Sequence, residues 1–198
     1  MVVGGNTVLT RPFCSILGVL LAASTACAAQ FSIFPDRKDL RSPDGRFVVH
    51  SVEQVNQSTD FTGVFRSLVL EDTKTGQSRN LYDYVGRVAV AWSGDRFLIV
   101  TDYASKKTAR ALVFRVDQPA EMVAVNKTTL GQRVPAEFRA HLEGNDHVYV
   151  EVSRIEKDTL FLNVWGYGAL DAHGFRFVCS MDLSDGTVRC EERAGGGR

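Results

Sequence analysis

The sequence predicts an all-β protein built from about three four-stranded antiparallel units, packed as a partial or open propeller or as a sandwich. Past residue 40, apolar residues alternate with polar ones or form short β-branched runs, with almost no helical period. Turn residues interrupt these runs about every ten positions. Two short motifs also recur about every fifty residues, which is typical of repeated β-sheet units.

The expected strands are short, and polar or glycine-containing turns separate them. Many short strands with regularly spaced turns favour a sandwich, barrel or propeller over a parallel α/β sheet. The expected strands cover residues 46–55, 64–71, 79–82, 85–92, 96–101, 110–116, 121–125, 137–142, 147–153, 159–165, 175–182 and 187–191.

The first recurring motif is a small polar turn followed by a strand. Residues 42–49 read SPDGRFVV, and Arg-Phe-Val-Val at 46–49 is echoed by RFLI at 96–99 and HVYV at 147–150. Proline presets the backbone angle of such a turn, aspartate bonds nearby amides, and glycine accepts a positive φ. We therefore expect Asp44 to have a structural role and no catalytic one.

The second motif places an aspartate four residues before a glycine. It occurs as Asp72 to Gly76 and again as Asp182 to Gly186, whereas the middle copy keeps Asp117 and turns with a proline. A period near fifty residues with about four strands per unit is the sequence pattern of blade-like architectures.

These residues resemble the TolB-type, WD-repeat-like propeller repeat, whose pattern runs S-P-D-G, strand, strand, D-x-x-T-G. The resemblance covers about three-quarters of the chain and weakens from the first unit to the third. It implies four-stranded blades, but closed propellers have about 4 to 8 of them. With material for about three, either the blades pack as an open assembly or sandwich, or two chains complete a ring. Proteins of unrelated function share this repeat, so the resemblance implies a fold and little else.

The first 28 residues are expected to be a secretory signal peptide. Arg11 precedes the apolar run 13–23, and Ala26-Cys27-Ala28 fits cleavage after Ala28. The apolar run is shorter than the about 20 residues that a membrane-spanning helix needs. We expect a soluble periplasmic or secreted domain, 29–198, although a lipoprotein anchored through Cys27 is an alternative.

The charge balance excludes one class of partner. Lysine plus arginine and aspartate plus glutamate each total 23, so no overall field attracts phosphates. We therefore expect no nucleic-acid partner and, after signal removal, no membrane span.

Cys179 and Cys190 are expected to form a disulfide. Both segments alternate, and 183–186 is a turn that would place Asp182 opposite Thr187 and the two cysteines opposite each other. In an oxidising compartment such a pair bridges. Two buried free thiols are the alternative.

One local cluster carries metal-ligand atoms: His141, Glu143, Asp146 and His147. Two imidazoles and a carboxylate can hold zinc. Their spacing lies across an expected β-turn, so the favoured interpretation is a solvated turn, with no metal and no cofactor.

Two loops and the segment 81–84 are the candidate binding elements. Segment 102–108 is a basic hairpin with one aromatic residue, segment 165–174 is glycine-rich, and a tyrosine pair lies between the first two units. Aromatic side chains often dominate interface energetics, and packing between blades is the alternative. The candidate residues are Tyr82, Tyr84, Tyr103, Lys106, Lys107, Trp165 and Tyr167.

The sequence contains no nucleophile elbow, phosphate-binding loop or dinucleotide motif. We therefore expect a protein-binding domain and no enzyme. The sharper hypothesis is an inhibitor or immunity factor of a secreted effector or cell-wall hydrolase. A cell-envelope scaffold or accessory protein is the alternative, followed by a metal-dependent hydrolase using His141, Glu143 and His147.

Overall fold

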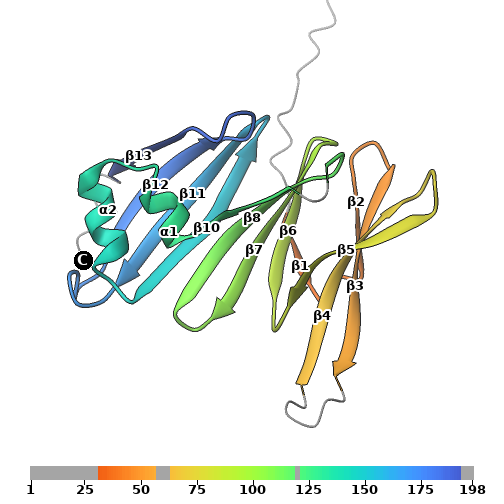
Figure 1. Ribbon diagram of the computed structural model, residues 1–198, viewed down its shortest axis with the longest axis horizontal. Coiled ribbons are helices and arrows are strands. Elements are labelled where there is room, and N and C mark those ends of the chain that lie inside the picture. Colours follow the sequence, from red (N-terminus) through yellow and green to blue (C-terminus); the bar gives the residue numbers. More distant parts are fainter. Residues whose placement is uncertain (1–30, 57–62, 119–120, 193–198) are drawn as a thin grey trace, which may run out of the picture.

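The computed structural model describes residues 31–56, 63–118 and 121–192. Its strands form three four-stranded units in a row, with the first unit orange to yellow, the second green and the third cyan to blue (Figure 1). The described strands form no closed barrel. The predicted all-β class and the predicted open arrangement of about three units are therefore confirmed.

The first unit is a separate antiparallel sheet. Its strands follow chain order: β2 (Asp39–Arg41), β3 (Phe47–Asn56), β4 (Gly63–Asp72) and β5 (Gln77–Tyr84). Strands β3 to β5 agree with the sequence prediction, whereas the three-residue β2 was not predicted.

The second unit consists of β6 (Val88–Ser93), β7 (Phe97–Ser105), β8 (Thr108–Arg115) and β9 (Met122–Val125). The N-terminal strand β1 (Ser32–Phe34), which was also not predicted, pairs with β6 rather than with its neighbour in sequence. The chain thus enters the second unit, leaves to build the first, and returns.

The third unit consists of β10 (His147–Glu156), β11 (Thr159–Tyr167), β12 (Phe175–Asp182) and β13 (Val188–Glu192). It joins the second unit through a short parallel pairing of β10 with β8, at Val148 with Thr108 and Tyr149 with Ala109. Together the second and third units and β1 make a nine-stranded sheet.

This joined sheet is strongly curved. Thr101 of β7 bonds the amide of Val152 in β10 at 3.4 Å, although β8 lies between the two strands in the sheet order. Likewise Ser93 at the end of β6 donates to the carbonyl of Lys157 in the β10–β11 turn at 2.6 Å. The third unit therefore curls back over one face of the second.

Two hydrophobic cores flank the second unit. Alternate residues of β7 serve one core each: Leu98 and Val100 pack with the first unit, whereas Ile99 packs with the third. All three side chains are fully buried. A near-continuous apolar run, as in β6 and β7, predicts a strand that is buried on both faces, and the structure agrees.

Two short helices lie beside the third unit, α1 (Lys127–Gly131) and α2 (Ala136–Glu143) (Figure 1). The prediction of a strand at 137–142 was wrong. A capping box at Asn126 and Thr129 starts α1. Both helices and the segment between them bury apolar residues in the core at every fourth position: Leu130 in α1, Val134 in the connection, and Phe138 and Leu142 in α2.

The recurring aspartate–glycine motif is the same turn in both copies. The Gly76 amide donates to the Asp72 carbonyl at 2.8 Å, and the Gly186 amide donates to the Asp182 carbonyl at 2.9 Å. The glycine φ angles are +70° and +72°, a region that other residues rarely adopt. The motif therefore marks equivalent hairpin turns of the first and third units.

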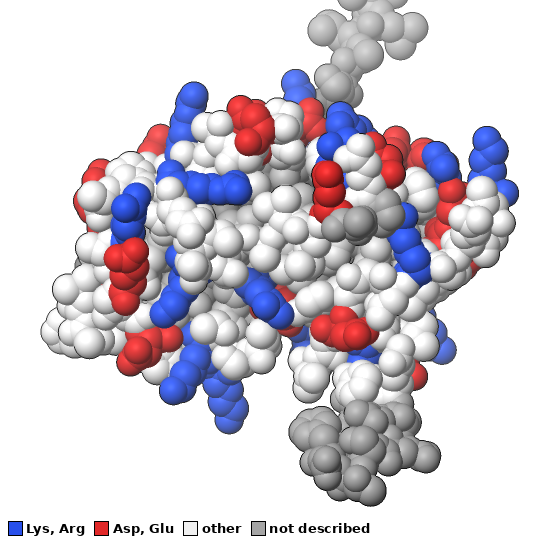
Figure 2. All heavy atoms as spheres, in the orientation of Figure 1, with Lys and Arg blue, Asp and Glu red and all other residues white. Residues whose placement is uncertain are grey.

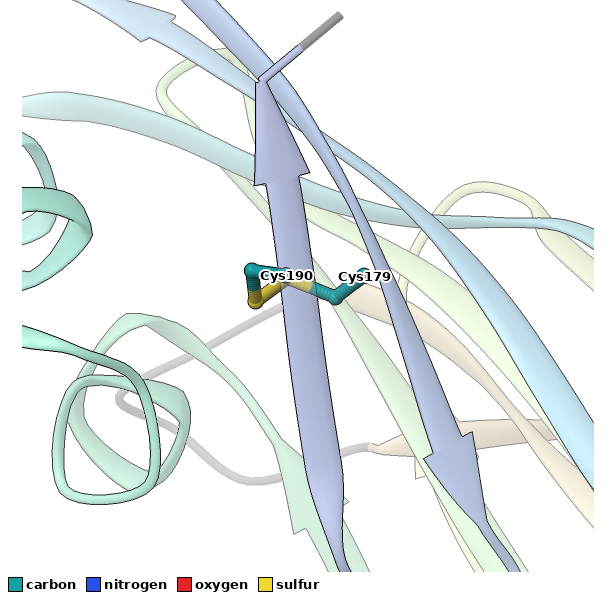
Figure 3. The surroundings of a disulfide bond; sticks show 2 residues. All are labelled: Cys179 and Cys190. Carbon is teal, nitrogen blue, oxygen red and sulfur yellow. A yellow bond between two sulfur atoms is a disulfide. The ribbon is translucent and has the colours of Figure 1, made fainter.

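Cys179 and Cys190 form the predicted disulfide between β12 and β13 (Figure 3). The two residues are directly paired, with a Cα–Cα distance of 4.0 Å, which is the close spacing of a non-hydrogen-bonded pair. The bridge fits an oxidising compartment.

The expected signal peptide at 1–28, with Cys14 and Cys27, lies outside the described residues. Within the described ranges, no helix is long and apolar enough to cross a membrane. Positive and negative side chains are interspersed over the face drawn in Figure 2, consistent with the balanced composition.

Candidate functional site

The outward face of the third unit carries a group of partly exposed aromatic side chains. Along β11, and along β10 as far as its bulge after Val152, every second residue packs in the core, and the residues between them point to the opposite face. We call this surface the aromatic face, and its residues are His147, Tyr149, Glu151, Phe161, Trp165 and Tyr167.

The rings of the aromatic face form two cross-strand stacks. His147 lies opposite Tyr167, with ring centroids 4.3 Å apart and an interplanar angle of 10°. Tyr149 lies opposite Trp165, at 4.0 Å and 12°. Direct cross-strand neighbours are close enough for such contact, so strand pairing fixes each stack.

Polar contacts hold these rings in place. Trp165 donates from Nε1 to Glu151 at 3.0 Å, and the Tyr149 hydroxyl donates to the carbonyl of Lys106 at 2.6 Å. Partial burial raises the pKa of Tyr149, and the neighbouring Tyr167 and the negative charge of Glu151 act in the same direction. Tyr149 is therefore a neutral hydroxyl at physiological pH.

A close approach of the backbone explains one glycine between the two β11 aromatics. A Cβ added to Gly166 would lie 2.1 Å from the carbonyl oxygen of His147. Glycine is thus required where β11 passes close to β10. This close approach lets Trp165 and Tyr167, on either side of Gly166, stack on the facing rings of β10.

Five of the seven predicted binding residues gather at or beside the aromatic face. Trp165 and Tyr167 belong to it. Lys106 and Lys107 lie in the β7–β8 turn, and the Lys107 carbonyl accepts the amide of Val148. Tyr103 on β7 is 44% exposed, and its pKa is raised by burial and by the charge of Glu151.

The other two predicted residues lie elsewhere, between the first and second units. Tyr84 is only 3% exposed and its hydroxyl bonds the Ser51 hydroxyl at 2.6 Å, so it is a packing residue here. Tyr82 bonds Asp102 and Arg110 across the two units. Both tyrosines line a hollow of about 420 Å³.

Asp102 is the buried centre of that contact. Its side chain is 3% exposed, and it pairs with Arg110 at 3.2 Å. Burial, followed by the bond to Asp102, raises the pKa of Tyr82 to about 12. These three side chains connect β5 of the first unit to β7 and β8 of the second, so they stabilise the contact between the two units.

Sequence reasoning missed Tyr149 as a member of the site and considered His147 only as a metal ligand. The alternation of 147–151 was visible, and it indicates which residues share a face. Which β11 residue lies opposite each of them depends on a bulge in β10, which the sequence does not reveal.

The four residues with metal-ligand atoms, for which the sequence favoured a solvated turn over a metal site, do not converge on one point. His141 bonds Asp171 through Nδ1 at 2.9 Å and stacks on Phe175, whereas His147 stacks on Tyr167. Across residues 31–56, 63–118 and 121–192, no three His, Cys, Asp or Glu side chains are arranged to hold a metal ion. Glu143 ends α2.

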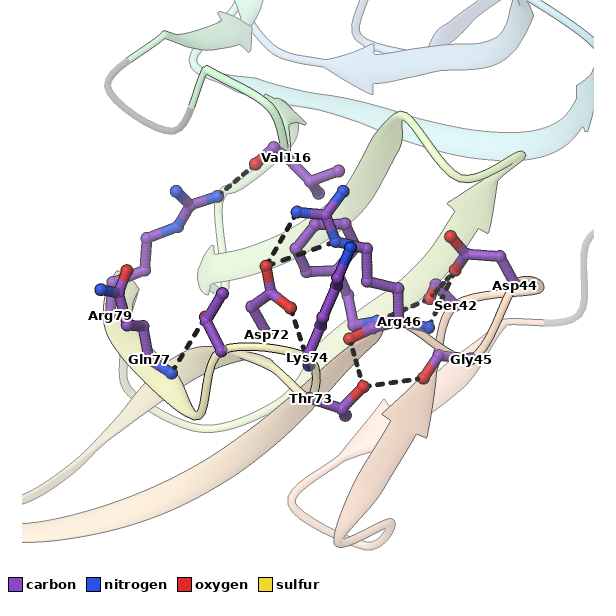
Figure 4. A network of polar contacts seen from close by, with 12 residues as sticks. Ser42, Asp44, Gly45, Arg46, Asp72, Thr73, Lys74, Gln77, Arg79 and Val116 are labelled. Carbon is purple, nitrogen blue, oxygen red and sulfur yellow. Dashed lines mark hydrogen bonds and ion pairs between the residues drawn. The ribbon is translucent and has the colours of Figure 1, made fainter.

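A second concave surface, the inter-unit pocket, lies between the turns of the first and second units and has a volume of about 580 Å³. Its walls include Phe47, Leu70 and Val116. Figure 4 shows the polar network on its rim, where Arg46 is directed to Asp72 and Arg79 to the Val116 carbonyl. Asp44 and Asp95 also line the pocket. The backbone amide of Asp44 donates a hydrogen bond to the Asp95 carboxylate at 2.9 Å, and this bond links the two repeat turns.

No protein-family model matches this chain, and no curated protein shows significant similarity to it. The resemblance to the TolB-type repeat therefore stays a prediction, and function is inferred from the geometry of the chain itself.

Proposed function

We propose that the protein is an exported binding protein that captures a protein partner on the aromatic face of its third unit. The observation that supports this most directly is the pair of ring stacks on a partly exposed sheet face, beside Glu151 and the Lys106–Lys107 turn.

The residue types of this face are those of an interface. Tyrosine and tryptophan bury large areas at a small cost in side-chain entropy, and they recur at positions that dominate binding energy. Stacking and the bonds to Glu151 and Lys106 already order the rings. A preordered surface loses less entropy on binding, so its affinity per contact is higher.

The sharper form of the proposal is an inhibitor or immunity factor. Two loops flank the end of the aromatic face at which His147 pairs with Tyr167: the turn with Lys106 and Lys107, and the segment after β11 with Leu170, which is 54% exposed. Such loops suit insertion into the cleft of a secreted effector or cell-wall hydrolase. The disulfide and the expected signal peptide favour a partner in the same exported compartment.

A site-specific cross-linking experiment tests the partner. A photoreactive phenylalanine analogue replaces Tyr167, which is 43% exposed, in cells that export the protein. The control replaces Met122 on β9, which is 45% exposed and lies in the second unit. We expect an adduct with one protein at position 167 and none at 122.

The identified partner is then purified and its affinity measured. Trp165→Ala should weaken binding by roughly 30-fold, the effect of a hot spot worth about 2 kcal/mol, and Met122→Ala should leave it unchanged. Equal adducts at both positions, or full affinity of Trp165→Ala, would contradict the proposal. Inhibition of a partner enzyme supports the inhibitor form, whereas binding without inhibition supports a scaffold.

A further inference from the structure

We propose that the inter-unit pocket is a second binding site, independent of the aromatic face, which takes a ligand bearing a carboxylate group and holds it with Arg79 and Arg96. The pocket lies between the first and second units, and its volume of about 580 Å³ is in the range of small-molecule sites.

The aspartates that line the pocket already have partners within the chain. Asp72 binds Arg46 at 2.9 Å and the Lys74 amide at 2.9 Å. Asp44 accepts from the Ser42 hydroxyl at 2.6 Å and from the Arg46 amide at 3.0 Å. These hydrogen bonds lower the pKa of both carboxyl groups.

The remaining two aspartates are engaged as well. Asp95 accepts the Asp44 amide at 2.9 Å. Asp117 pairs with Arg115 at 3.2 Å, and that contact lowers its pKa. Each of the four aspartates in the pocket is thus bound to a backbone amide, a hydroxyl group, or an arginine other than Arg79 and Arg96, namely Arg46 or Arg115.

Arg79 forms no ion pair with a carboxylate among the described residues. Its one side-chain hydrogen bond goes to the Val116 carbonyl at 2.6 Å, and its Nε is buried without a partner among the described residues. Burial lowers the pKa of Arg79, although the charge of Asp72 acts in the opposite direction. A cation that is desolvated without a matching anion is costly, and a bound carboxylate would offset that cost.

Arg96 supplies a second guanidinium to the same pocket. It lies over the ring of Phe97 at 5.3 Å and forms no ion pair with any described carboxylate. Arg96 lines the pocket near Asp117, and its positive charge contributes to the lowered pKa of Asp117. Two arginines that pair with no described carboxylate therefore line one cavity.

The ligand class follows from the donors and the walls. A planar guanidinium matches the geometry of a carboxylate, and such charge-assisted bonds are among the strongest in proteins. Phe47, Leu70 and Val116 provide an apolar surface beside the arginines. A small organic acid with an apolar part, free or at the C-terminal end of a peptide, combines both features.

The test compares two probes that differ only in charge, N-acetylleucine and N-acetylleucine amide. Titration calorimetry on the intact exported domain should give at least 10-fold tighter binding of the acid than of the amide. Arg96→Gln should reduce acid binding at least 10-fold, and Arg79→Gln should do the same. Arg87→Gln, which alters an exposed arginine paired with Asp36, should have no effect.

Because Arg79 also bonds the second unit, Arg79→Gln could unfold the protein, and the exposed Arg96 then carries the test. Equal binding of acid and amide, or unchanged acid binding in Arg96→Gln, would overturn the proposal. Tighter binding of inorganic phosphate than of the acid would overturn the carboxylate assignment. Isocaproate keeps the branched apolar chain and the carboxylate of N-acetylleucine but lacks its peptide group. Tighter binding of isocaproate than of N-acetylleucine supports a free small acid as the ligand, and the reverse order supports a peptide end.

Discussion

Asn145 is 2% exposed, and its side-chain amide has a partner for each polar atom. The nitrogen donates to the His141 carbonyl at 2.8 Å and to Asp171 at 2.6 Å, and the oxygen accepts the Asp171 amide at 3.0 Å. This residue therefore ties the end of α2 to the segment after β11, which is the loop that flanks the aromatic face.

Asp171 makes this cluster sensitive to pH. Burial alone would raise its pKa, but hydrogen bonds from His141 and Asn145 and the charge of His141 outweigh that effect, so the pKa is lowered. The fold therefore stabilises the ionised form. This contribution is fully present above the unfolded pKa of about 3.9 and is lost as the pH falls through the folded pKa.

Asp171→Asn should lower the free energy of unfolding by about 1–3 kcal/mol at pH 6, because charge-assisted bonds to a mostly buried group are lost. The difference from the unsubstituted protein should shrink towards zero as the pH falls below the folded pKa. Urea unfolding across this range measures it. Asp36→Asn, at an exposed pair, is the control; a difference that does not change with pH would contradict the assignment.

The turn from Asp72 to Gly76, which joins β4 to β5, depends on one backbone angle. Gly76 has φ +70°, and an added Cβ would meet no atom within 4 Å. The requirement for glycine is therefore conformational and not steric crowding by neighbours.

Gly76→Ala should destabilise the protein by about 1–2 kcal/mol, the cost of a left-handed conformation for a residue with a Cβ. Gly131→Ala is the matched control, because Gly131 lies in α1 and its nearest side-chain neighbours would be at 3.9 Å. That variant should gain about 0.5 kcal/mol from helix propensity. Equal effects of the two changes in chemical denaturation would contradict this account.

The disulfide constrains the terminal hairpin of the third unit. Cys179 and Cys190 are 11 residues apart in sequence, and closing such a loop stabilises a fold by about 3 kcal/mol in the chain-entropy description. Replacing both cysteines by alanine should reduce the free energy of unfolding by about that amount. Reductant should have the same effect on the unsubstituted protein and none on the double variant; a loss under reductant in the variant would assign the effect to another cause.

The strands were largely predictable because alternation and turn residues are local signals. Asp72-to-Gly76 and Asp182-to-Gly186 gave two equivalent turns, and the expected cysteine pairing followed from one turn length. The helix α2 was not foreseen because it has only eight residues and buries only Phe138 and Leu142, which is too few apolar positions to establish a helical period.

The aromatic face was only partly predictable, since a β-bulge sets its pairs. From the β10–β11 turn, Glu156 pairs with Thr159 and Arg154 with Phe161, but beyond Ser153 the register shifts by one. Simple counting from the turn would place Tyr149 opposite Gly166, and no ring stack would follow. The extra residue in the bulge brings Tyr149 to Trp165.

The second unit contributes to both cores, and polar contacts connect it to each neighbour. Asp102 bonds Tyr82 of the first unit, and Ser93 bonds Lys157 of the third. The units therefore share interfaces, and we expect them to unfold together in one transition.

Asp102→Asn should lower the free energy of unfolding by about 2–3 kcal/mol. The change removes the negative charge of Asp102, whose side chain is 3% exposed, and leaves the partly buried Arg110 without its ion-pair partner. Glu156→Gln alters an exposed pair with Arg154 and should cost less than about 1 kcal/mol. Chemical denaturation followed by two probes measures both. Two separated transitions in the unsubstituted protein would contradict the expected cooperativity.

The pairing of β1 with β6 also makes the first unit an insertion in the connectivity of the chain. Phe34 and Val88 are register partners, so β2 to β5 form an excursion that leaves and re-enters the sheet at one point. A unit could be gained or lost there without rethreading any other strand. The number of units in the row can thus change at the first unit, and the strand order of the third unit, which carries the aromatic face, stays the same.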